Sequence, residues 1–190
     1  MKIYILSILL LIYTNVFASE DAQEFNSPDS SCKIVYKGPD RGEGVFYNKA
    51  YMNNPIYKGY VRYGPIINWE SNSLAEILIP TGSPNYHSYY YNCLTSKLSP
   101  RFNLAVAIDE TKSIVATIEQ GYINFHSIDS EKSFYTHETP KVGLAEYFIY
   151  CESESQFITT NKLEVKMSCG KDENYTYEIN VPNKSVKQTD

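Results

Sequence analysis

The sequence lacks the short motifs that mark common hydrolases, redox proteins and zinc sites. Its 190 residues hold no G-x-S-x-G turn, no H-E-x-x-H pair and no C-x-x-C pair. The three histidines, His87, His126 and His137, are dispersed, and His126 lies in strand phase with Asn124 and opposite Phe125, which predicts a solvent-facing side chain. We therefore expect a binding protein and not an enzyme, with no catalytic residues, no metal and no cofactor.

Basic residues are outnumbered by acidic ones. The chain holds 17 lysines and arginines against 22 aspartates and glutamates, a formal net charge of −5. Such a surface repels nucleic acid and anionic lipid, so neither is expected as a partner. It suits a basic partner protein, although mild acidity is also what keeps many soluble proteins apart.

Long apolar runs are missing except at the N-terminus. Lys2 is followed by an apolar run from Ile3 to Ile12 and then by Val16-Phe17-Ala18, whose first and last residues are the two positions that signal peptidase reads and carry the smaller side chains. This run is too short for a membrane anchor, so we expect no stable membrane insertion after cleavage. The sequence thus predicts a signal peptide over 1–18 and a periplasmic or secreted product.

The remaining chain is long enough for one ordinary domain, although two small packed sheets would also fit. Residues 19–31 are polar and predict a flexible segment, residues 32–182 a single β domain, and residues 183–190 a C-terminal tail.

Cysteine is scarce but even in number, which predicts two disulfides in an oxidising compartment. Three pairings are possible for Cys32, Cys93, Cys151 and Cys169. The strands that carry Cys151 and Cys169 both point the thiol toward the apolar face, and the polar stretch 152–162 joins them as a hairpin. We therefore favour Cys151 with Cys169 and Cys32 with Cys93.

Helical periodicity is nearly absent. Residues 175–181 alternate aromatic or branched with polar side chains, and residues 113–125 predict a hairpin that turns at Gln120-Gly121. The predicted strands are 33–36, 44–51, 57–63, 66–70, 74–79, 86–91, 104–108, 113–119, 122–128, 146–151, 163–169 and 175–181. About a dozen short strands without crossover helices predict an all-β antiparallel sandwich or barrel.

Tyrosine is abundant, with 18 residues, and it is concentrated in the segment from Tyr86 to Tyr91. Because side chains alternate along a β-strand, Tyr89 and Tyr91 are expected on one face, and Tyr86, Ser88 and Tyr90 on the other. Tyrosine builds recognition surfaces, but it is also an ordinary strand residue whose hydroxyl ends a core in water.

We take Tyr86, His87, Tyr89 and Tyr90 as candidate partner-binding residues. The single tryptophan, Trp69, is expected in the core.

The loop from Asp40 to Gly44 holds two carboxylates but lacks the ligand spacing of an EF-hand, and Arg41 between them opposes a cation. We therefore read it as a connecting loop, and Asp40 and Glu43 as candidate partner contacts. Asn174 and Asn183 match the glycosylation acceptor pattern, which matters only in a eukaryotic source.

The middle of the chain holds a run from Trp69 to Gly82, followed by Tyr89-Tyr90-Tyr91, Ser99-Pro100-Arg101-Phe102 and Ile114-Val115-Ala116. This arrangement resembles that of small exported β-rich proteins of Gram-negative bacteria. Exported proteins of similar architecture include immunity proteins and lysozyme inhibitors. By analogy of class, the resemblance implies steric occlusion of a partner's active site, and it transfers no catalytic position.

Three functions remain open. The first is a periplasmic inhibitor or immunity protein that neutralises a basic toxin or hydrolase by steric occlusion. The second is a carbohydrate-binding or adhesive β-sandwich in which Trp69 and residues 86–91 would stack on sugars. The third is a structural protein of the cell envelope.

Overall fold

A computed structural model describes residues 22–82, 85–119, 121–139, 152–153, 155–169 and 173–183. The predicted signal peptide, the proposed cleavage site and most of the C-terminal tail lie outside these residues. No helix in the described part is both long and apolar enough to cross a membrane.

The described chain consists of antiparallel strands and one short 3-10 helix, η1 (Lys49–Tyr51). The strands form four sheets. Sheet A holds β1 (Gln23–Asn26), β2 (Lys33–Lys37), β3 (Gly42–Asn48) and β4 (Pro55–Val61). Sheet B holds β5 (Ile66–Trp69), β6 (Leu74–Gly82), β7 (Asn85–Asn92), β8 (Lys97–Leu98) and β9 (Phe102–Asn103).

Sheet C holds β10 (Ala105–Asp109), β11 (Ile114–Glu119), β12 (Tyr122–Ser127) and β13 (Ser133–Glu138). Sheet D holds β14 (Glu152–Ser153), β15 (Gln156–Thr159), β16 (Lys162–Cys169) and β17 (Glu173–Asn180). The all-β antiparallel prediction is thus confirmed. The sheets are open, so the barrel alternative is wrong. Strands β8, β9 and β14 were not predicted, because they have too few residues to show a periodic pattern.

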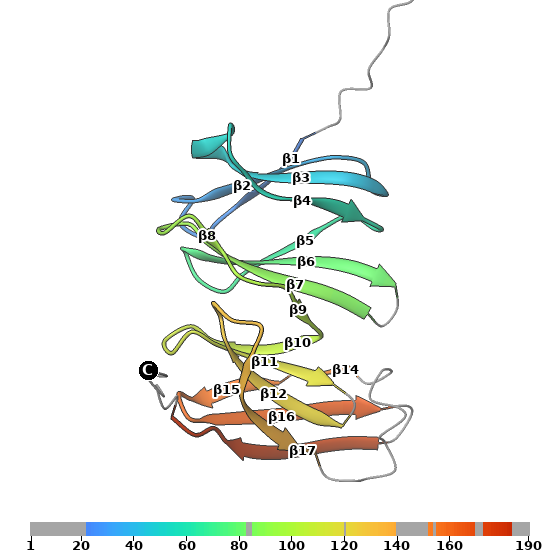
Figure 1. The fold of residues 1–190 in the computed structure, drawn as a ribbon, viewed down its shortest axis with the longest axis vertical. Coiled ribbons are helices and arrows are strands. Elements are labelled where there is room, and N and C mark those ends of the chain that lie inside the picture. The colour runs from blue at the N-terminus through green and yellow to red at the C-terminus, as the bar shows by residue number, and fades with distance from the viewer. Residues whose placement is uncertain are drawn as a thin grey trace, which may run out of the picture.

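The four sheets lie on top of one another in the order A, B, C and D along the long axis of the molecule (Figure 1). Sheets A and B share a core in which Tyr36 and Phe46 face Ile77 and Tyr91. Sheets C and D share a second core, built around Ile123, Phe125 and Leu163. Sheet B therefore packs against sheet A with one face and against sheet C with the other, and sheet C packs likewise between sheets B and D.

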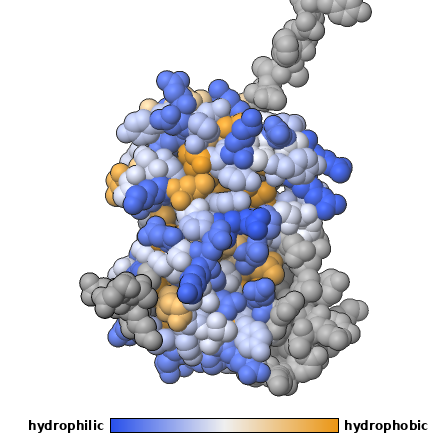
Figure 2. Space-filling view, in the orientation of Figure 1, coloured by the Kyte–Doolittle hydropathy of each residue, from blue (hydrophilic) through white to orange (hydrophobic). Residues whose placement is uncertain are grey.

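A smaller core joins sheet B to sheet C. It consists of Leu74, Tyr90, Phe102, Ala105 and Val115. The chain crosses from B to C at Leu104, whose N–H donates to the Tyr86 carbonyl at 3.3 Å and whose carbonyl accepts from the Ile118 N–H at 3.1 Å. The outer surface is mostly polar, with small separate apolar patches on the face drawn in Figure 2.

Two glycines explain local features of these sheets. Gly121 closes the β11–β12 hairpin, in which Glu119 pairs with Tyr122, and its φ of +85° favours a residue without a side chain. This confirms the predicted hairpin. Gly44 lies under the Tyr36 ring, where an added Cβ would come within 2.3 Å of the ring.

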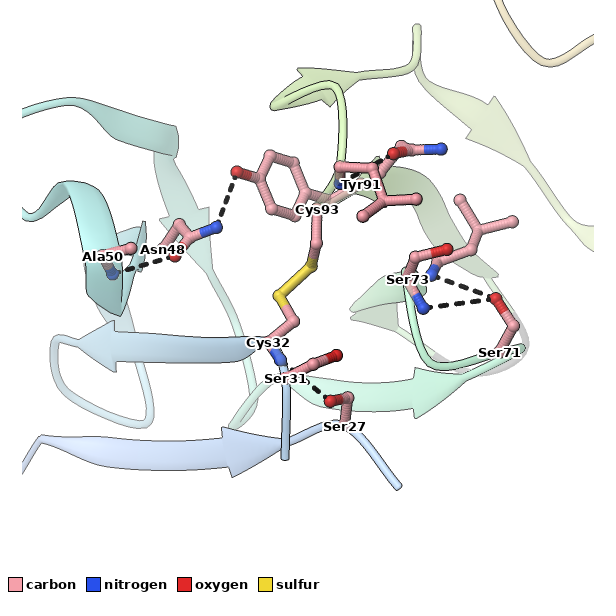
Figure 3. The surroundings of a disulfide bond; sticks show 12 residues. Ser27, Ser31, Cys32, Asn48, Ala50, Ser71, Ser73, Tyr91 and Cys93 are labelled. Atoms are coloured by element: carbon pink, nitrogen blue, oxygen red, sulfur yellow. Dashed lines mark hydrogen bonds between the residues drawn. A yellow bond between two sulfur atoms is a disulfide. The ribbon is translucent and has the colours of Figure 1, made fainter. Parts of the chain in front are cut away.

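One disulfide is seen, between Cys32 and Cys93, and it confirms that part of the predicted pairing. It joins the turn before β2 in sheet A to the end of β7 in sheet B, and it lies beside the hydrogen bond from Asn48 Nδ2 to the Tyr91 hydroxyl, 3.1 Å (Figure 3). The predicted Cys151–Cys169 bond involves Cys151, which lies outside the described residues, so it stays a prediction.

The predicted flexible segment 19–31 is partly ordered. Residues Gln23–Asn26 form β1, and Phe25 on this strand pairs in register with Ile34 of β2 and packs against the A–B core. Ser27 and Asp29 then bond the following turn: the Cys32 N–H donates to Ser27 Oγ at 3.0 Å, and the Ser31 N–H donates to Asp29 Oδ1 at 2.9 Å. One apolar side chain and these turn bonds are too few to produce a strand pattern in the sequence.

Candidate binding sites

The tyrosine-rich segment forms β7, an interior strand of sheet B that pairs with β6 on one side and with β8 and β9 on the other. The predicted alternation holds, because Tyr89 and Tyr91 pair with Ile77 and Ala75 on the side of sheet A. Tyr90 belongs to the core on the side of sheet C. Both faces of the strand are therefore covered by a neighbouring sheet.

The tyrosine side chains of β7 are engaged in this interior. Tyr90 is 3% exposed, and burial raises its pKa well above the ordinary value. The Tyr89 ring lies 4.8 Å from the Tyr57 ring, and burial raises the pKa of Tyr89. The Tyr86 hydroxyl donates to the Ala105 carbonyl at 2.7 Å, and burial raises its pKa to about 12. These rings support the sheets and leave little free aromatic surface on β7.

Two of the exposed tyrosines lie on and just after β4. Tyr60 and Tyr63 are 57% and 51% exposed. The Arg41 Nε–H donates to the Tyr60 hydroxyl at 3.3 Å, and the Arg62 guanidinium lies 5.5 Å from the centre of the Tyr63 ring. The register of sheet A brings Glu43 opposite Tyr60.

We define the tyrosine–arginine surface by these side chains and their neighbours in the β2–β3 turn and on β4: Asp40, Arg41, Glu43, Lys58, Tyr60, Arg62 and Tyr63. Asp40 and Glu43, which the sequence singled out, therefore lie beside exposed aromatic rings. The sequence did not single out Tyr60 and Tyr63, because alternation along β4 looks the same as alternation along β7 and does not show which tyrosines are exposed.

The charge of this end of the molecule differs from that of the rest. Residues 22–69 hold six basic and four acidic side chains, whereas residues 70–190 hold ten basic and 16 acidic ones. Within the described part of the chain, Arg41 and Arg62 have no carboxylate partner, while Lys58 reaches Glu43 only at 3.9 Å. The surface around Tyr60 is therefore locally cationic on an acidic protein.

A second feature is a cleft of about 560 Å³ between sheets B and C, which we call the interlayer cleft. It is lined by Thr81, Tyr86, His87, Arg101, Phe102, Asn103, Leu104, Thr117, Ile118, Glu119, His126 and Glu131. His87 and Tyr86 come from β7, whereas Glu119 and His126 come from β11 and β12. Of the candidate residues on β7, Tyr86 and His87 border this cleft.

His126 fixes one wall of this cleft, contrary to the expectation of a solvent-facing residue. Its Nδ1 lies 2.8 Å from the Glu131 carbonyl, its Nε2 lies 3.0 Å from Thr117 Oγ1, and its ring centre lies 5.4 Å from that of Phe102. Burial lowers the pKa of His126. Alternation placed His126 on the face opposite Phe125, as observed, but that face is covered by sheet B.

His87 has a related environment. Burial, followed by the charge of Arg101, lowers its pKa. Its Nδ1 is buried and has no hydrogen-bond partner among the described residues. An imidazole whose Nδ1 has no partner among the described residues therefore borders the cleft.

A cluster of carboxylates lies elsewhere in the junction of sheets B and C. Glu76 is only 8% exposed and accepts a hydrogen bond from Asn68 Nδ2 at 2.8 Å. Desolvation, with the charges of Glu76 and Glu110, raises the pKa of Glu70 to about 7. No group of histidine, cysteine and carboxylate side chains in the described residues has a metal-binding arrangement.

The remaining residues named from the sequence have separate environments. Trp69 packs against the A–B core but is only half-buried, so the expected core position is met only in part. Asn174 lies in β17, and the exposed Asn183 accepts a hydrogen bond from Lys112 Nζ at 3.0 Å. Whether either is glycosylated stays a prediction.

Comparison with known proteins adds no family. No protein-family model matches the chain, and no curated protein matches it with significance. The resemblance to exported β-rich proteins therefore rests on the quoted residues alone.

Proposed function

We propose that the chain is an exported binding protein that blocks a partner hydrolase by covering its active site with the tyrosine–arginine surface. The observation that carries this proposal is the pairing of two exposed tyrosines, Tyr60 and Tyr63, each with its own guanidinium. Tyrosine and arginine are the residue types that contribute most to binding at protein interfaces, together with tryptophan.

The surface is held in place before a partner arrives. Arg62 Nη1 donates to the Thr81 carbonyl of sheet B at 2.9 Å, so that its guanidinium is fixed beside Tyr63. Tyr60 lies on a strand paired to β3, and the Cys32–Cys93 bond ties sheet A to sheet B. Side chains that are already ordered lose less conformational entropy on binding, which favours affinity.

The charges suggest which enzyme would fit. Glycoside hydrolases carry a pair of carboxylates at the scissile bond, and Arg41 and Arg62 are complementary to such a site. The net charge of −5 attracts an enzyme that is basic as a whole. A basic hydrolase with an acidic active-site cleft matches both the long-range and the local charge.

Asp40 and Glu43 lie at the edge of this surface, where they would contact basic residues around the mouth of such a cleft. Exposed charges of this kind contribute about 0.2–1 kcal/mol each and act mainly on the association rate. We therefore assign them a role in orientation, and Tyr60, Tyr63 and the two arginines the larger share of binding.

The experiment is an inhibition assay of the purified protein against basic secreted hydrolases, with lysozyme as the first glycosidase and a basic ribonuclease as a non-glycosidase. We expect inhibition of the glycosidase and a rise of at least tenfold in the inhibition constant for Tyr60→Ala and Arg41→Ala. Tyr122→Ala is the matched control, because Tyr122 is an exposed tyrosine of sheet C.

Equal loss of inhibition in Tyr122→Ala would contradict the assigned surface. Absence of inhibition across a wide panel of basic glycosidases would overturn the proposed function. Inhibition of the ribonuclease alone would overturn the assignment to glycosidases while leaving occlusion in place.

A further inference from the structure

We propose that the interlayer cleft is a separate binding site for a neutral saccharide. The cleft lies between sheets B and C, and none of its lining residues belongs to the tyrosine–arginine surface. Its volume of about 560 Å³ lies within the range of small-ligand sites and would hold one or two sugar units.

The aromatic part of the site is Tyr86. Its hydroxyl is already used, because it donates to the Ala105 carbonyl across the junction of the two sheets. The side chain is half-buried, so its ring is held in one position while it borders the cleft. An aromatic ring in a fixed position is a suitable apolar partner for the face of a sugar ring.

The polar part of the site offers both donors and acceptors. Arg101 supplies N–H donors, and Glu119 and Glu131 supply carboxylate acceptors. Each of these three residues is solvent-exposed, so their polar groups are accessible from the open side of the cleft. Sugar hydroxyls donate and accept at the same oxygen, and a mixture of this kind satisfies them in both roles.

The charges argue against an ion as ligand. The two carboxylates outnumber the single guanidinium, so the cleft is not cationic, which disfavours phosphate or another anion. Burial lowers the pKa values of His87 and His126, which disfavours a positive charge on either imidazole. The described residues also provide no metal-binding cluster for a cation.

The backbone at the base of the cleft is rigid. Leu104 connects sheets B and C through hydrogen bonds to Tyr86 and Ile118, with φ at +49°. His126 is fixed by the Glu131 carbonyl and Thr117. These hydrogen bonds fix the base of the cleft before a ligand binds. A small ligand requires such a preformed site, because its binding energy is too small to reorganise the protein.

The test is titration of the purified protein with cellobiose, maltose, lactose and N,N′-diacetylchitobiose, followed by isothermal calorimetry and amide chemical shifts. We expect at least one disaccharide to bind and to shift the amides of Glu119 and His126. The dissociation constant should rise at least tenfold in Arg101→Gln and in Glu119→Gln.

Lys97→Gln and Asp129→Asn serve as controls, since these exposed residues line a different cavity, of about 330 Å³. Thermal melting of each variant separates a lost contact from a lost fold, and Glu131→Gln provides a third substitution if one of the first two melts early. The proposal is overturned if no neutral disaccharide binds, or if binding is unchanged in the cleft variants.

Sodium glutamate and phosphate are the charged probes. Preferential binding of either one in the cleft would also overturn the assignment to a neutral sugar. Neither result bears on the hydrolase assay, because that assay depends on Tyr60 and Arg41.

Discussion

Strands β4 and β7 both carry tyrosines, yet the outward-facing tyrosine of β4 and the tyrosines of β7 have opposite environments. Tyr60 on β4 is more than half exposed, whereas Tyr90 on β7 is buried in the junction of sheets B and C. Both strands alternate inward and outward side chains in the same way. The difference arises from the sheet in which each strand lies, because sheet A has a free outer face, whereas sheet B lies between sheets A and C.

This comparison separates two uses of the same residue type. A tyrosine between two sheets supports packing and fixes neighbouring groups, as Tyr86 does at Ala105. A tyrosine on an outer face is available to a partner. Whether a neighbouring sheet covers the tyrosine, more than the local sequence, decides whether it supports packing or is available to a partner.

The largest expected effect comes from removing the covalent bond between sheets A and B. The Cys32–Cys93 bond closes a segment with a sequence separation of 61. Replacing both cysteines by alanine should lower the free energy of unfolding by about 4 kcal/mol on the chain-entropy model. Urea denaturation measures this change, and a loss below about 1 kcal/mol would show that packing alone holds sheet A on sheet B.

The next effect concerns the buried tyrosine of β7. Tyr90→Ala should lower the free energy of unfolding by about 3 kcal/mol, because it leaves a cavity beside Phe102 and Val115. The measurement is again urea denaturation. A change of less than about 1 kcal/mol would mean that the B–C junction collapses around the missing ring.

The exposed tyrosine of β4 should behave in the opposite way. Tyr60→Ala should change the free energy of unfolding by less than about 0.5 kcal/mol, because the ring is largely in water and its substitution leaves no cavity. Thermal melting measures stability and the hydrolase assay measures binding on the same sample. If the variant lost stability as Tyr90→Ala does, the contrast between the two strands would fail.

A last effect is a change in the pH dependence of stability at the B–C junction. The pKa of Glu70 is raised from 4.5 to about 7 in the folded protein, so the folded state holds this proton more tightly. Its contribution to stability is therefore fully present below pH 4.5 and is lost as the pH rises through 7.

Glu70→Gln should flatten this part of the profile, so that the variant gains stability relative to the parent protein at pH 8 compared with pH 4.5. Denaturation of both proteins at the two pH values gives the difference. An equal difference at pH 4.5 and pH 8 would show that Glu70 does not titrate in this range.

The sequence predicts the local features of the fold well. Alternation in residues 113–125 predicts β11 and β12, and the Gln120-Gly121 pair predicts the turn between them. The sequence also favours the Cys32–Cys93 bond. These features depend on neighbouring residues or on the direction of a side chain within one strand, which periodicity reports directly.

The environment of each face could not be predicted in the same way. Alternation places Asn124 and His126 on one face of β12, but it does not show that sheet B covers His126. It likewise places Tyr90 and Tyr60 on a face without showing which has a neighbouring sheet. Two-sided coverage depends on how four sheets are ordered in space, and no single strand carries that information.

The Cys32–Cys93 bond also bears on how the protein would survive proteases. The exposed turn at Asn53 and Asn54 lies between the two linked cysteines in the sequence. A single cut there would leave two fragments joined by sulfur, with Arg41 on one piece and Tyr60 on the other, still paired through β3 and β4. A nicked molecule would run as one band on a non-reducing gel and as two after reduction, and it would keep its outer face assembled.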